Sequence, residues 1–215
     1  MEFKIIKDPW KHFFCKSFLN LNHALEMSKV FPNWDSEIWD THGKIFRSNY
    51  AYKKELTKRD NFPEIIYDFI KKLETKEFIE KISFLTGIND LIVDKNLYGG
   101  GLNIFPPGSY LKPHVDFNFN DEMKSYRAIN LIYYLNCDYE NNVGGGFELY
   151  DNEFKKVKTI SPSLNTCILF ASNNKTPHGV GKIENFYRKS ISLWYYTKKP
   201  PDKISTTPHK TIWIE

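Results

Sequence analysis

Apolar residues in the first part of the chain recur at the spacing of helices. Two runs, residues 61–73 and 75–87, repeat apolar side chains three or four positions apart, as on one face of a helix. These stripes consist of Ile66, Phe69, Ile70 and Leu73, and of Phe78, Ile79, Ile82 and Leu85. Thr75 is a suitable cap for the second helix, and Gly87 is a suitable end. With a further helix expected at about residues 20–30, the pattern predicts helices that pack against a core.

The pattern changes near residue 95, where short β-type runs begin to alternate with turn residues. Eight runs are rich in β-branched and aromatic residues, which is typical of strands. They are residues 98–105, 110–117, 126–136, 146–150, 154–160, 166–171, 178–183 and 189–197. Eight strands at this spacing predict a sandwich or barrel, with the jelly roll as the natural solution. The fold class is therefore α+β with a mostly β core and N-terminal helices packed on one sheet.

The domain organisation follows from the same change in pattern. We expect a single domain over residues 1–215, with residues 1–95 as a helical support, 96–198 as the jelly-roll core and 199–215 as a tail. The tail ends in an apolar tether at residues 212–214. The aromatic stretch 31–52 is open to two interpretations, a substrate lid or ordinary packing against the barrel.

Composition narrows the class of protein. The chain has 215 residues, 41% hydrophobic and 26% charged, which is ordinary for a globular protein. The net charge of +4 is spread out, so it gives weak support for a nucleic-acid partner and none for a membrane surface. The three cysteines lie far apart in the sequence and form no disulfide framework. No run approaches the roughly 20 apolar residues of a membrane span, and no secretory signal is evident. A cytoplasmic location is expected.

The segment around residue 114 carries the first candidate chemistry. Side chains of a strand alternate between its two faces, which places Tyr110, Lys112, His114, Asp116 and Asn118 on one face. His114 and Asp116 offer an imidazole nitrogen and a carboxylate oxygen from one rigid support. Two histidines and one carboxylate on one face of an octahedron form the ligand set of non-heme Fe(II) oxygenases. The pair alone is weak evidence, because a polar contact at a strand end is the commoner explanation.

A third ligand is expected from a distant strand, and His178 is the best candidate. It lies at the start of a strand, 62 residues after Asp116, between a proline and a glycine. The other histidines lie in the helical part or in the tail: His12, His23, His42 and His209. The combined pattern therefore predicts a metal site formed by His114, Asp116 and His178.

The strand at 188–197 supplies an anion-binding candidate. Alternation places Arg188, Ser190, Ser192 and Trp194 on one face and Ile191, Leu193 and Tyr195 on the other. A buried arginine requires an anion, and its guanidinium can grip a carboxylate with two parallel hydrogen bonds. A hairpin from His178 is expected to bring Arg188 near the metal, unless Arg188 forms a structural ion pair with an acidic residue.

Two further features lie near this candidate in the predicted fold. In the strand 126–136, Ala128, Asn130, Ile132 and Tyr134 share a face, so the Tyr134 hydroxyl can reach the same carboxylate, although plain core packing competes for Tyr134 and Trp194. Three glycines follow at 144–146. A phosphate cradle is disfavoured there, because the motif lacks GKS/T and a helix start, and a bulge or hairpin is preferred.

These residues resemble the Fe(II)- and 2-oxoglutarate-dependent dioxygenases, and among them the prolyl 4-hydroxylase-like branch. The likeness covers about residues 97–197. It is carried by Tyr110-x-x-x-His114-x-Asp116, the run IYYLN at 132–136, the glycine-rich turn before Phe147-Glu148-Leu149, and Arg188-x-x-Ile191-x-x-Trp194-Tyr195. It implies a double-stranded β-helix and an enzyme that converts 2-oxoglutarate and O2 to succinate and CO2 while hydroxylating a substrate C–H bond.

The resemblance also implies roles for single residues. His114, Asp116 and His178 would bind Fe(II), and Arg188 with Tyr134 would hold the distal carboxylate of 2-oxoglutarate. Ser190 and Trp194 are expected beside the cosubstrate, with Trp194 near it or near His178. Tyr110 and Asn118 are the residues expected to begin substrate contact. Ascorbate is a further cofactor that the resemblance allows.

The sequence departs from the family pattern at one position and narrows the subclass at others. Phe105 stands where relatives often have a tyrosine, which removes one hydroxyl from the pocket. Asp116 argues against a halogenase, and the absence of a second arginine after Arg188 argues against an alkylated-base demethylase. A peptidyl proline and a small metabolite such as an amino acid or sugar both remain open as substrate.

Two other classes of protein compete with the oxygenase. A non-catalytic jelly-roll binding module explains the strands and aromatics, but not the coincidence of three ligand-type residues with an inward arginine. A metal-dependent hydrolase needs a general base near the metal-bound water. No glutamate or further histidine lies at an obvious spacing for that role.

Overall fold

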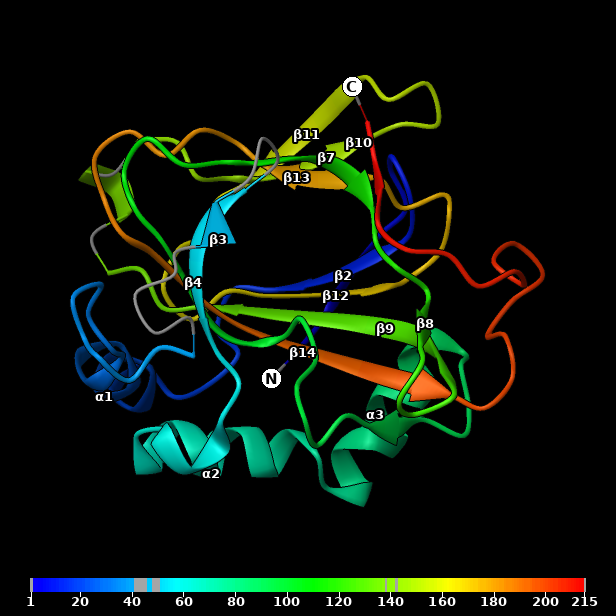
Figure 1. Ribbon diagram of the computed structural model, residues 1–215, viewed down its shortest axis with the longest axis horizontal. Coiled ribbons are helices and arrows are strands. Elements are labelled where there is room, and N and C mark those ends of the chain that lie inside the picture. The colour runs from blue at the N-terminus through cyan, green and yellow to red at the C-terminus, as the bar shows by residue number, and fades with distance from the viewer. Residues whose placement is uncertain (1, 41–45, 48–50, 138, 142, 215) are drawn as a thin grey trace.

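Two antiparallel sheets face each other in the computed structural model, which describes residues 2–40, 46–47, 51–137, 139–141 and 143–214 (Figure 1). The larger sheet has the order β1-β2-β12-β9-β14-β6-β4-β3, with β5 paired to β14 and β8 paired to β9. Its strands are β1 (Lys4–Ile6), β2 (His12–Cys15), β3 (Phe46–Arg47), β4 (Tyr52–Leu56), β5 (Ile92–Val93), β6 (Gly101–Phe105), β8 (Phe119–Asn120), β9 (Ser125–Tyr134), β12 (Cys167–Ala171) and β14 (Arg188–Thr197).

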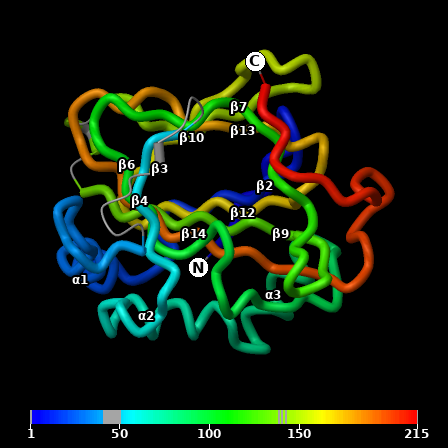
Figure 2. The backbone as a smooth tube through the Cα atoms, viewed as in Figure 1, coloured from blue at the N-terminus to red at the C-terminus, as the bar shows by residue number. Residues whose placement is uncertain are grey.

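The smaller sheet lies opposite, in the order β11-β10-β13-β7-β15. Its strands are β7 (Leu111–Val115), β10 (Phe147–Tyr150), β11 (Lys156–Ile160), β13 (His178–Val180) and β15 (Ile212–Trp213). Each of the eight runs predicted from the sequence overlaps one of the strands. The backbone trace shows the two sheets as separate layers (Figure 2). The prediction of a mostly β jelly roll with helices on one sheet is confirmed.

The α-helices of the described part of the chain cover the outer face of the larger sheet (Figure 1). They are α1 (Leu21–Val30), α2 (Glu64–Leu73) and α3 (Lys76–Thr86), and 3₁₀ turns lie at Arg59–Asn61 and Tyr139–Asn141. The Thr75 side chain caps α3 by accepting from the backbone of Phe78, and Gly87 ends it in the left-handed conformation at φ 78°. The helical spacing in the sequence therefore located both the helices and the ends of α3.

The part of the chain before residue 95 needs a correction, because it also contributes strands to the larger sheet. The antiparallel pair β1–β2 continues the sheet beyond β12, and β4 continues it beyond β6. These strands were missed because they are short and lie among helical signals. In the stretch 31–52, Trp39 is buried in the core, whereas residues 41–45 and 48–50, His42 among them, lie outside the described residues.

The hydrophobic core has two layers, one on each face of the larger sheet. The first lies between this sheet and the helices and contains Ile191, Leu193 and Tyr195 of β14, as alternation predicted. The Tyr195 hydroxyl donates to the carbonyl of Leu73 at 3.0 Å and so joins the sheet to α2. Burial of a side chain such as Ile66, which is fully buried, stabilises the fold by roughly 1.5–3 kcal/mol.

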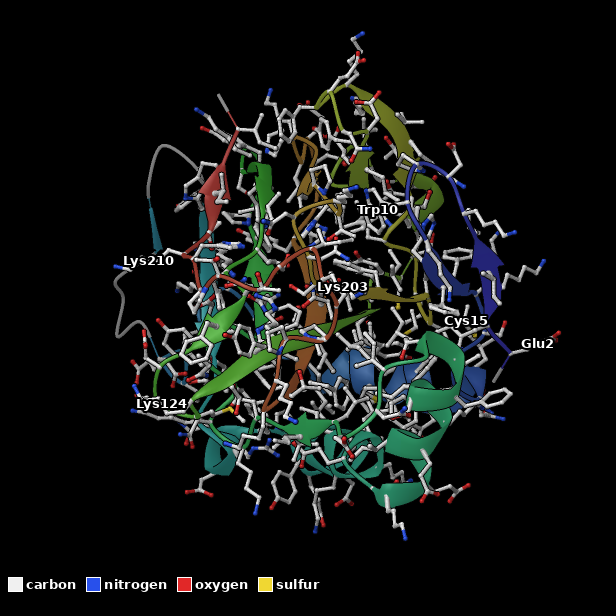
Figure 3. All side chains as sticks on the ribbon, turned by 90° about the vertical axis from the view of Figure 1, so that its right-hand side faces the viewer. Glu2, Trp10, Cys15, Lys124, Lys203 and Lys210 are labelled. Atoms are coloured by element: carbon white, nitrogen blue, oxygen red, sulfur yellow. The ribbon has the colours of Figure 1, made fainter. Side chains whose placement is uncertain are left out.

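The second core layer lies between the two sheets, and side chains fill the space that the ribbons leave open (Figure 3). Trp10, labelled there, donates its indole N–H to the carbonyl of Tyr150 at 3.1 Å, which links the segment before β2 to β10. The remaining members from the larger sheet include Ile132, Tyr134 and Trp194. This layer holds the inward faces of β9 and β14 in place beside the candidate site.

The C-terminal segment crosses the open side of this arrangement and returns to the smaller sheet. It ends in β15, which pairs with β7 so that Trp213 lies opposite His114. Asn118 fixes the segment by donating to the carbonyl of Thr207 at 2.9 Å and accepting from the backbone of His209 at 2.7 Å. The tether predicted at residues 212–214 is therefore a strand that lies beside the candidate site.

Candidate active site

His114 and His178 lie directly opposite each other on neighbouring strands. They are register partners in the antiparallel pair of β7 and β13, and their ring centroids are 4.5 Å apart. His114 Nδ1 is 2.8 Å from the carbonyl oxygen of Lys112, and His178 Nδ1 is 2.9 Å from that of Thr176. A carbonyl only accepts, so each Nδ1 carries the proton. Both Nε2 atoms are therefore left with a lone pair for a metal.

Asp116 completes a group of three possible ligands. It follows the last residue of β7, and its Oδ1 lies 3.5 Å from His114 Nε2 while its Oδ2 lies 3.5 Å from His178 Nε2. The three ligand atoms lie within 4.8 Å of one another. Two imidazole nitrogens and one carboxylate grouped in this way suit a divalent iron and leave further coordination positions open. The described residues therefore fit the predicted metal site.

The carboxylate of Asp116 is held by two side chains of β9. Arg127 Nη2 lies 3.0 Å from Oδ2, and Asn130 Nδ2 donates to the same oxygen at 2.8 Å. Arg127 Nε also donates to Asn130 Oδ1 at 2.6 Å, which closes the network. Burial alone would raise the pKa of the Asp116 carboxyl, but the Arg127 charge and the two imidazoles hold it well below its usual value. Asp116 is therefore an ionised ligand with one oxygen already occupied by donors.

Aromatic rings surround the imidazoles and exclude water from them. Phe147 and Phe170 lie against His178 with ring centroids 5.2 and 5.0 Å away, and Trp213 lies 5.0 Å from His114. Burial lowers the pKa of His178 to about 4, despite the opposing charge of Asp116. The His178 imidazole is therefore neutral near pH 7, as a metal ligand must be.

Arg127 was missed by the sequence analysis because a β-bulge changes which residues of β9 face the cavity. Tyr195 pairs with Ile129 and Tyr196 pairs with Arg127, so Ala128 is an extra residue in the ladder. Simple alternation had placed Ala128 beside Asn130. The bulge turns Arg127 inward instead, where its guanidinium stacks on Trp194 at 3.7 Å. Arg127 is a charged residue in a strand that is otherwise uncharged, and that charge is the sequence feature that could have drawn attention to it.

Arg188 is a buried cation at the other end of the site. Its side chain is 2% exposed; Nε donates to the carbonyl of Gly145 at 2.7 Å, and Nη2 donates to the Tyr134 hydroxyl oxygen at 3.3 Å. Among the described residues, no carboxylate lies within ion-pair distance of this guanidinium. Burial raises the pKa of Tyr134 to about 12, so its hydroxyl keeps a proton that it can donate. The pair is arranged to receive an anion from outside the chain.

The glycine-rich turn makes room for Arg188. Gly144 and Gly145 adopt φ values of 83° and 67°, which favour glycine. A Cβ at Gly145 would lie 2.9 Å from the Phe186 ring and 3.3 Å from Arg188 Cδ. The turn therefore lets the backbone approach the arginine and present a carbonyl to it, which agrees with a turn rather than a phosphate cradle.

One cavity of about 440 Å³ brings most of the predicted residues together. Those among its lining residues are His114, Asp116, His178, Arg188, Ser190 and Trp194. His178 and Arg188 meet across the two sheets, and not within a hairpin as expected, because β13 and β14 belong to different sheets. Trp194 stacks on Arg127 rather than on His178, and its buried indole N–H has no hydrogen-bond partner among the described residues.

The two residues expected to begin substrate contact lie elsewhere. Tyr110 is 37% exposed and is not among the residues that line the cavity. Asn118 is buried, and its amide holds the C-terminal segment. Alternation failed for Asn118 because β7 ends at Val115. The cavity wall contains residues that the sequence analysis did not single out, namely Lys53, Glu55, Asn103 and Trp213.

The match to known families agrees with this geometry. Residues 100–196 match the family described as the 2OG-Fe(II) oxygenase superfamily. That span holds the three candidate ligands and Arg188. This segment of the chain therefore belongs to the superfamily. The superfamily implies Fe(II) and 2-oxoglutarate as cofactor and cosubstrate, and the triad of an oxygenase is present in His114, Asp116 and His178.

Solved structures with the same fold include prolyl hydroxylases at low sequence identity. A prolyl-4-hydroxylase of Pseudomonas putida is 16% identical, with a TM-score of 0.65, and the match covers 86% of this chain and 92% of that one. A prolyl hydroxylase of Trichoplax adhaerens, solved with a hypoxia inducible factor peptide, is 22% identical with a TM-score of 0.60, covering 87% and 84%. The viral collagen prolyl hydroxylase of Paramecium Bursaria Chlorella virus-1 is 18% identical with a TM-score of 0.55, covering 89% and 99%.

Two negative findings complete the description of this oxygenase. No curated protein gives a significant match to the chain. Among the described residues, no helix combines the length and the apolar character that crossing a membrane would require.

Proposed function

We propose that this 2OG-Fe(II) oxygenase is a hydroxylase that couples the conversion of 2-oxoglutarate to succinate and CO2 to hydroxylation of a substrate C–H bond. The observation that carries the proposal is the buried Arg188, which has no acidic partner among the described residues and shares a cavity with the triad. A buried cation without a counter-ion is costly unless a ligand supplies the charge. A dicarboxylate that reaches from the triad to Arg188 satisfies both ends of the cavity.

Each residue of the site has a defined task in this proposal. His114, Asp116 and His178 hold Fe(II), and Arg188 binds the distal carboxylate of 2-oxoglutarate while the Tyr134 hydroxyl donates to it. Ser190, two residues after Arg188 and on the same face of β14, lies beside the cosubstrate. Iron and 2-oxoglutarate supply the oxidative chemistry when bound, and O2 is the oxidant. Ascorbate is proposed only as an accessory reductant.

The rest of the site keeps these groups oriented and dry. Arg127 and Asn130 fix Asp116 Oδ2, and the backbone carbonyls of Lys112 and Thr176 fix the tautomers of the imidazoles. Second-shell partners of this kind typically change metal affinity 10–100-fold when they are removed. The proposal thus assigns Arg127 and Asn130 to positioning and not to reaction with the substrate.

A prolyl residue of a peptide is one candidate substrate. It is supported by the likeness of the fold to prolyl hydroxylases and by a second cavity of about 830 Å³. Both cavities include Tyr98, Phe117, Thr211 and Trp213 in their walls, so they adjoin each other, and the second cavity offers room for the residues that flank a prolyl residue. A small metabolite is the other candidate, and it needs only the inner cavity.

The experiment that tests the proposal is anaerobic addition of Fe(II) and then 2-oxoglutarate to the purified chain, followed by exposure to O2. We expect a visible metal-to-ligand absorption band before O2 and succinate after it. His114→Ala and Asp116→Ala should abolish both signals. If the unaltered chain shows neither the band nor succinate, the hydroxylase proposal is wrong.

A further inference from the structure

Strand β4 forms one wall of the inner cavity and presents a cation and an anion to it. Alternation along β4 turns Lys53 and Glu55 toward the cavity, where both are lining residues. The residues between and after them face the other way: Lys54 lies over the Trp34 ring at 4.7 Å, and Leu56 belongs to the core beneath the sheet. The charged pair is therefore placed by the strand itself and not by a chance side-chain conformation.

The two charges are joined to each other and to the neighbouring strand. Lys53 Nζ lies 2.5 Å from Glu55 Oε1 and 2.9 Å from Asn103 Oδ1 on β6. The side chains of Lys53 and Glu55 are 15% and 25% exposed, so they are largely removed from bulk water while still bordering the cavity. A partly buried ion pair contributes little to folding stability, because desolvation offsets the attraction. Because both residues line the cavity, their charges are within reach of a ligand bound there.

This wall lies beyond the place proposed for the cosubstrate. In the strand register, Glu55 lies opposite Asn103, and Asn103 lies opposite Ser190, so these three residues form a row across β4, β6 and β14. The strand order puts Lys53 two strand spacings from Arg188, or about 9–10 Å across the sheet. The Phe105 ring lies between the two cations, with Arg188 5.3 Å and Lys53 5.7 Å from its centroid. Lys53 is therefore placed to bind a ligand other than the one held by Arg188.

We propose that Lys53, Glu55 and Asn103 form a substrate subsite for a free amino acid. This inference rests on the proposed hydroxylase function. Among the described residues, Asn103 and Glu55 occupy two of the three N–H groups of the Lys53 ammonium, which leaves the third for a carboxylate. Glu55 supplies the acceptor for an α-ammonium group. A zwitterion thus meets both charges at once and leaves the wall neutral, whereas the interior of a peptide offers no charged group to either.

The test measures succinate formed by the iron-loaded enzyme with 2-oxoglutarate, with each of the 20 standard L-amino acids and with their N-acetyl amides. We expect at least one free amino acid to stimulate succinate formation at least fivefold above the substrate-free rate. The blocked form of that amino acid should stimulate it less than twofold. Mass spectrometry should find the amino acid heavier by one oxygen atom.

Variants of the pair locate the effect. Lys53→Met and Glu55→Gln should each raise the KM for that amino acid at least tenfold, while the Kd for 2-oxoglutarate, read from the metal-to-ligand band, changes less than twofold. Lys155→Met is the matched control, because Lys155 pairs with Glu153 at 2.8 Å two residues away on the exposed surface. Its KM and Kd should both equal those of the unaltered chain.

Three outcomes would overturn the subsite. In the first, no free amino acid stimulates succinate formation although the substrate-free enzyme still forms succinate. In the second, blocked amino acids and prolyl peptides stimulate it as well as free amino acids do. In the third, Lys53→Met weakens the binding of 2-oxoglutarate and not that of the amino acid, which would make Lys53 part of the cosubstrate site. A protein that forms neither the band nor any succinate would instead contradict the hydroxylase proposal itself.

Discussion

Replacing Arg188 with methionine separates a ligand-binding arginine from a structural one. Methionine keeps much of the side-chain volume but removes the charge. In the ligand-free protein the change loses the bond from Nε to the Gly145 carbonyl, which costs about 1–3 kcal/mol, but it also removes a buried charge that has no acidic partner among the described residues. Because these effects oppose each other, we expect the free energy of unfolding to stay within about 2 kcal/mol of the unaltered value.

The larger effect should fall on 2-oxoglutarate. Hydrogen bonds to charged groups contribute about 1.5–3 kcal/mol each, and a loss of about 3 kcal/mol weakens binding roughly 100-fold. At a 2-oxoglutarate concentration of 100 times its Kd, binding stabilises the unaltered chain by about 2.7 kcal/mol. The variant at the same concentration should gain only about 0.4 kcal/mol. For a chain of this size, adding 2-oxoglutarate should therefore raise the melting temperature of the unaltered chain by roughly 5–10 °C and that of the variant by about 1 °C.

Arg59→Met is the matched control for this experiment. The Arg59 guanidinium forms an ion pair with Glu74, away from the cavity, with both side chains 18% exposed. Its loss should lower the melting temperature of the ligand-free protein while preserving the shift produced by 2-oxoglutarate. The reasoning is refuted if Arg188→Met itself loses the 3–5 kcal/mol typical of a broken buried ion pair and keeps the full 2-oxoglutarate shift.

Three further substitutions test the supports of the site. Gly145→Ala should lower both the free energy of unfolding and the affinity for 2-oxoglutarate, because the added Cβ would meet Phe186 and Arg188. Gly87→Ala is the control: its Cβ would meet nothing within 4 Å, so it should lower the free energy of unfolding by only about 1 kcal/mol. Urea unfolding and a 2-oxoglutarate titration compare the two variants. Arg127→Met should destabilise the metal-free protein by about 3–5 kcal/mol in urea, and a loss below 1 kcal/mol would contradict the buried pair with Asp116. Asn118→Ala should expose residues 199–214 to limited proteolysis, and an unchanged digestion pattern would show that other contacts hold the segment.

The sequence was informative where local periodicity decides the structure. His114 and Asp116 are two residues apart, so strand alternation was enough to predict that they point to one place. Helical spacing likewise located α2 and α3. Arg188 and Ser190 share the inward face of β14 for the same reason. Each of these predictions needed only the regular geometry of a single strand or helix, which decides directly which residues share a face.

Predictions failed where the structure depends on irregular or long-range pairing. The bulge at Ala128 shifts the alternation of β9 before Ile129 and so turns Arg127 inward, and no local rule predicts such a bulge, so Arg127 was overlooked. Asn118 was misplaced because β7 stops before it, and Lys53 and Glu55 were overlooked because β4 lies within a region of helical signals. His178 and Arg188 meet through the packing of two sheets, which depends on the whole fold.

The bulge at Ala128 also has a consequence for how such a site can change over generations. Side chains three residues apart in a regular strand point to opposite faces, so Arg127 and Asn130 both reach Asp116 because Ala128 is an extra residue between them. Loss of the Ala128 codon would remove the bulge but leave Arg127 two residues from Asn130 and on the same inward face. The number of residues between Arg127 and Asn130, and not only their identity, therefore decides whether a cation stands beside Asp116.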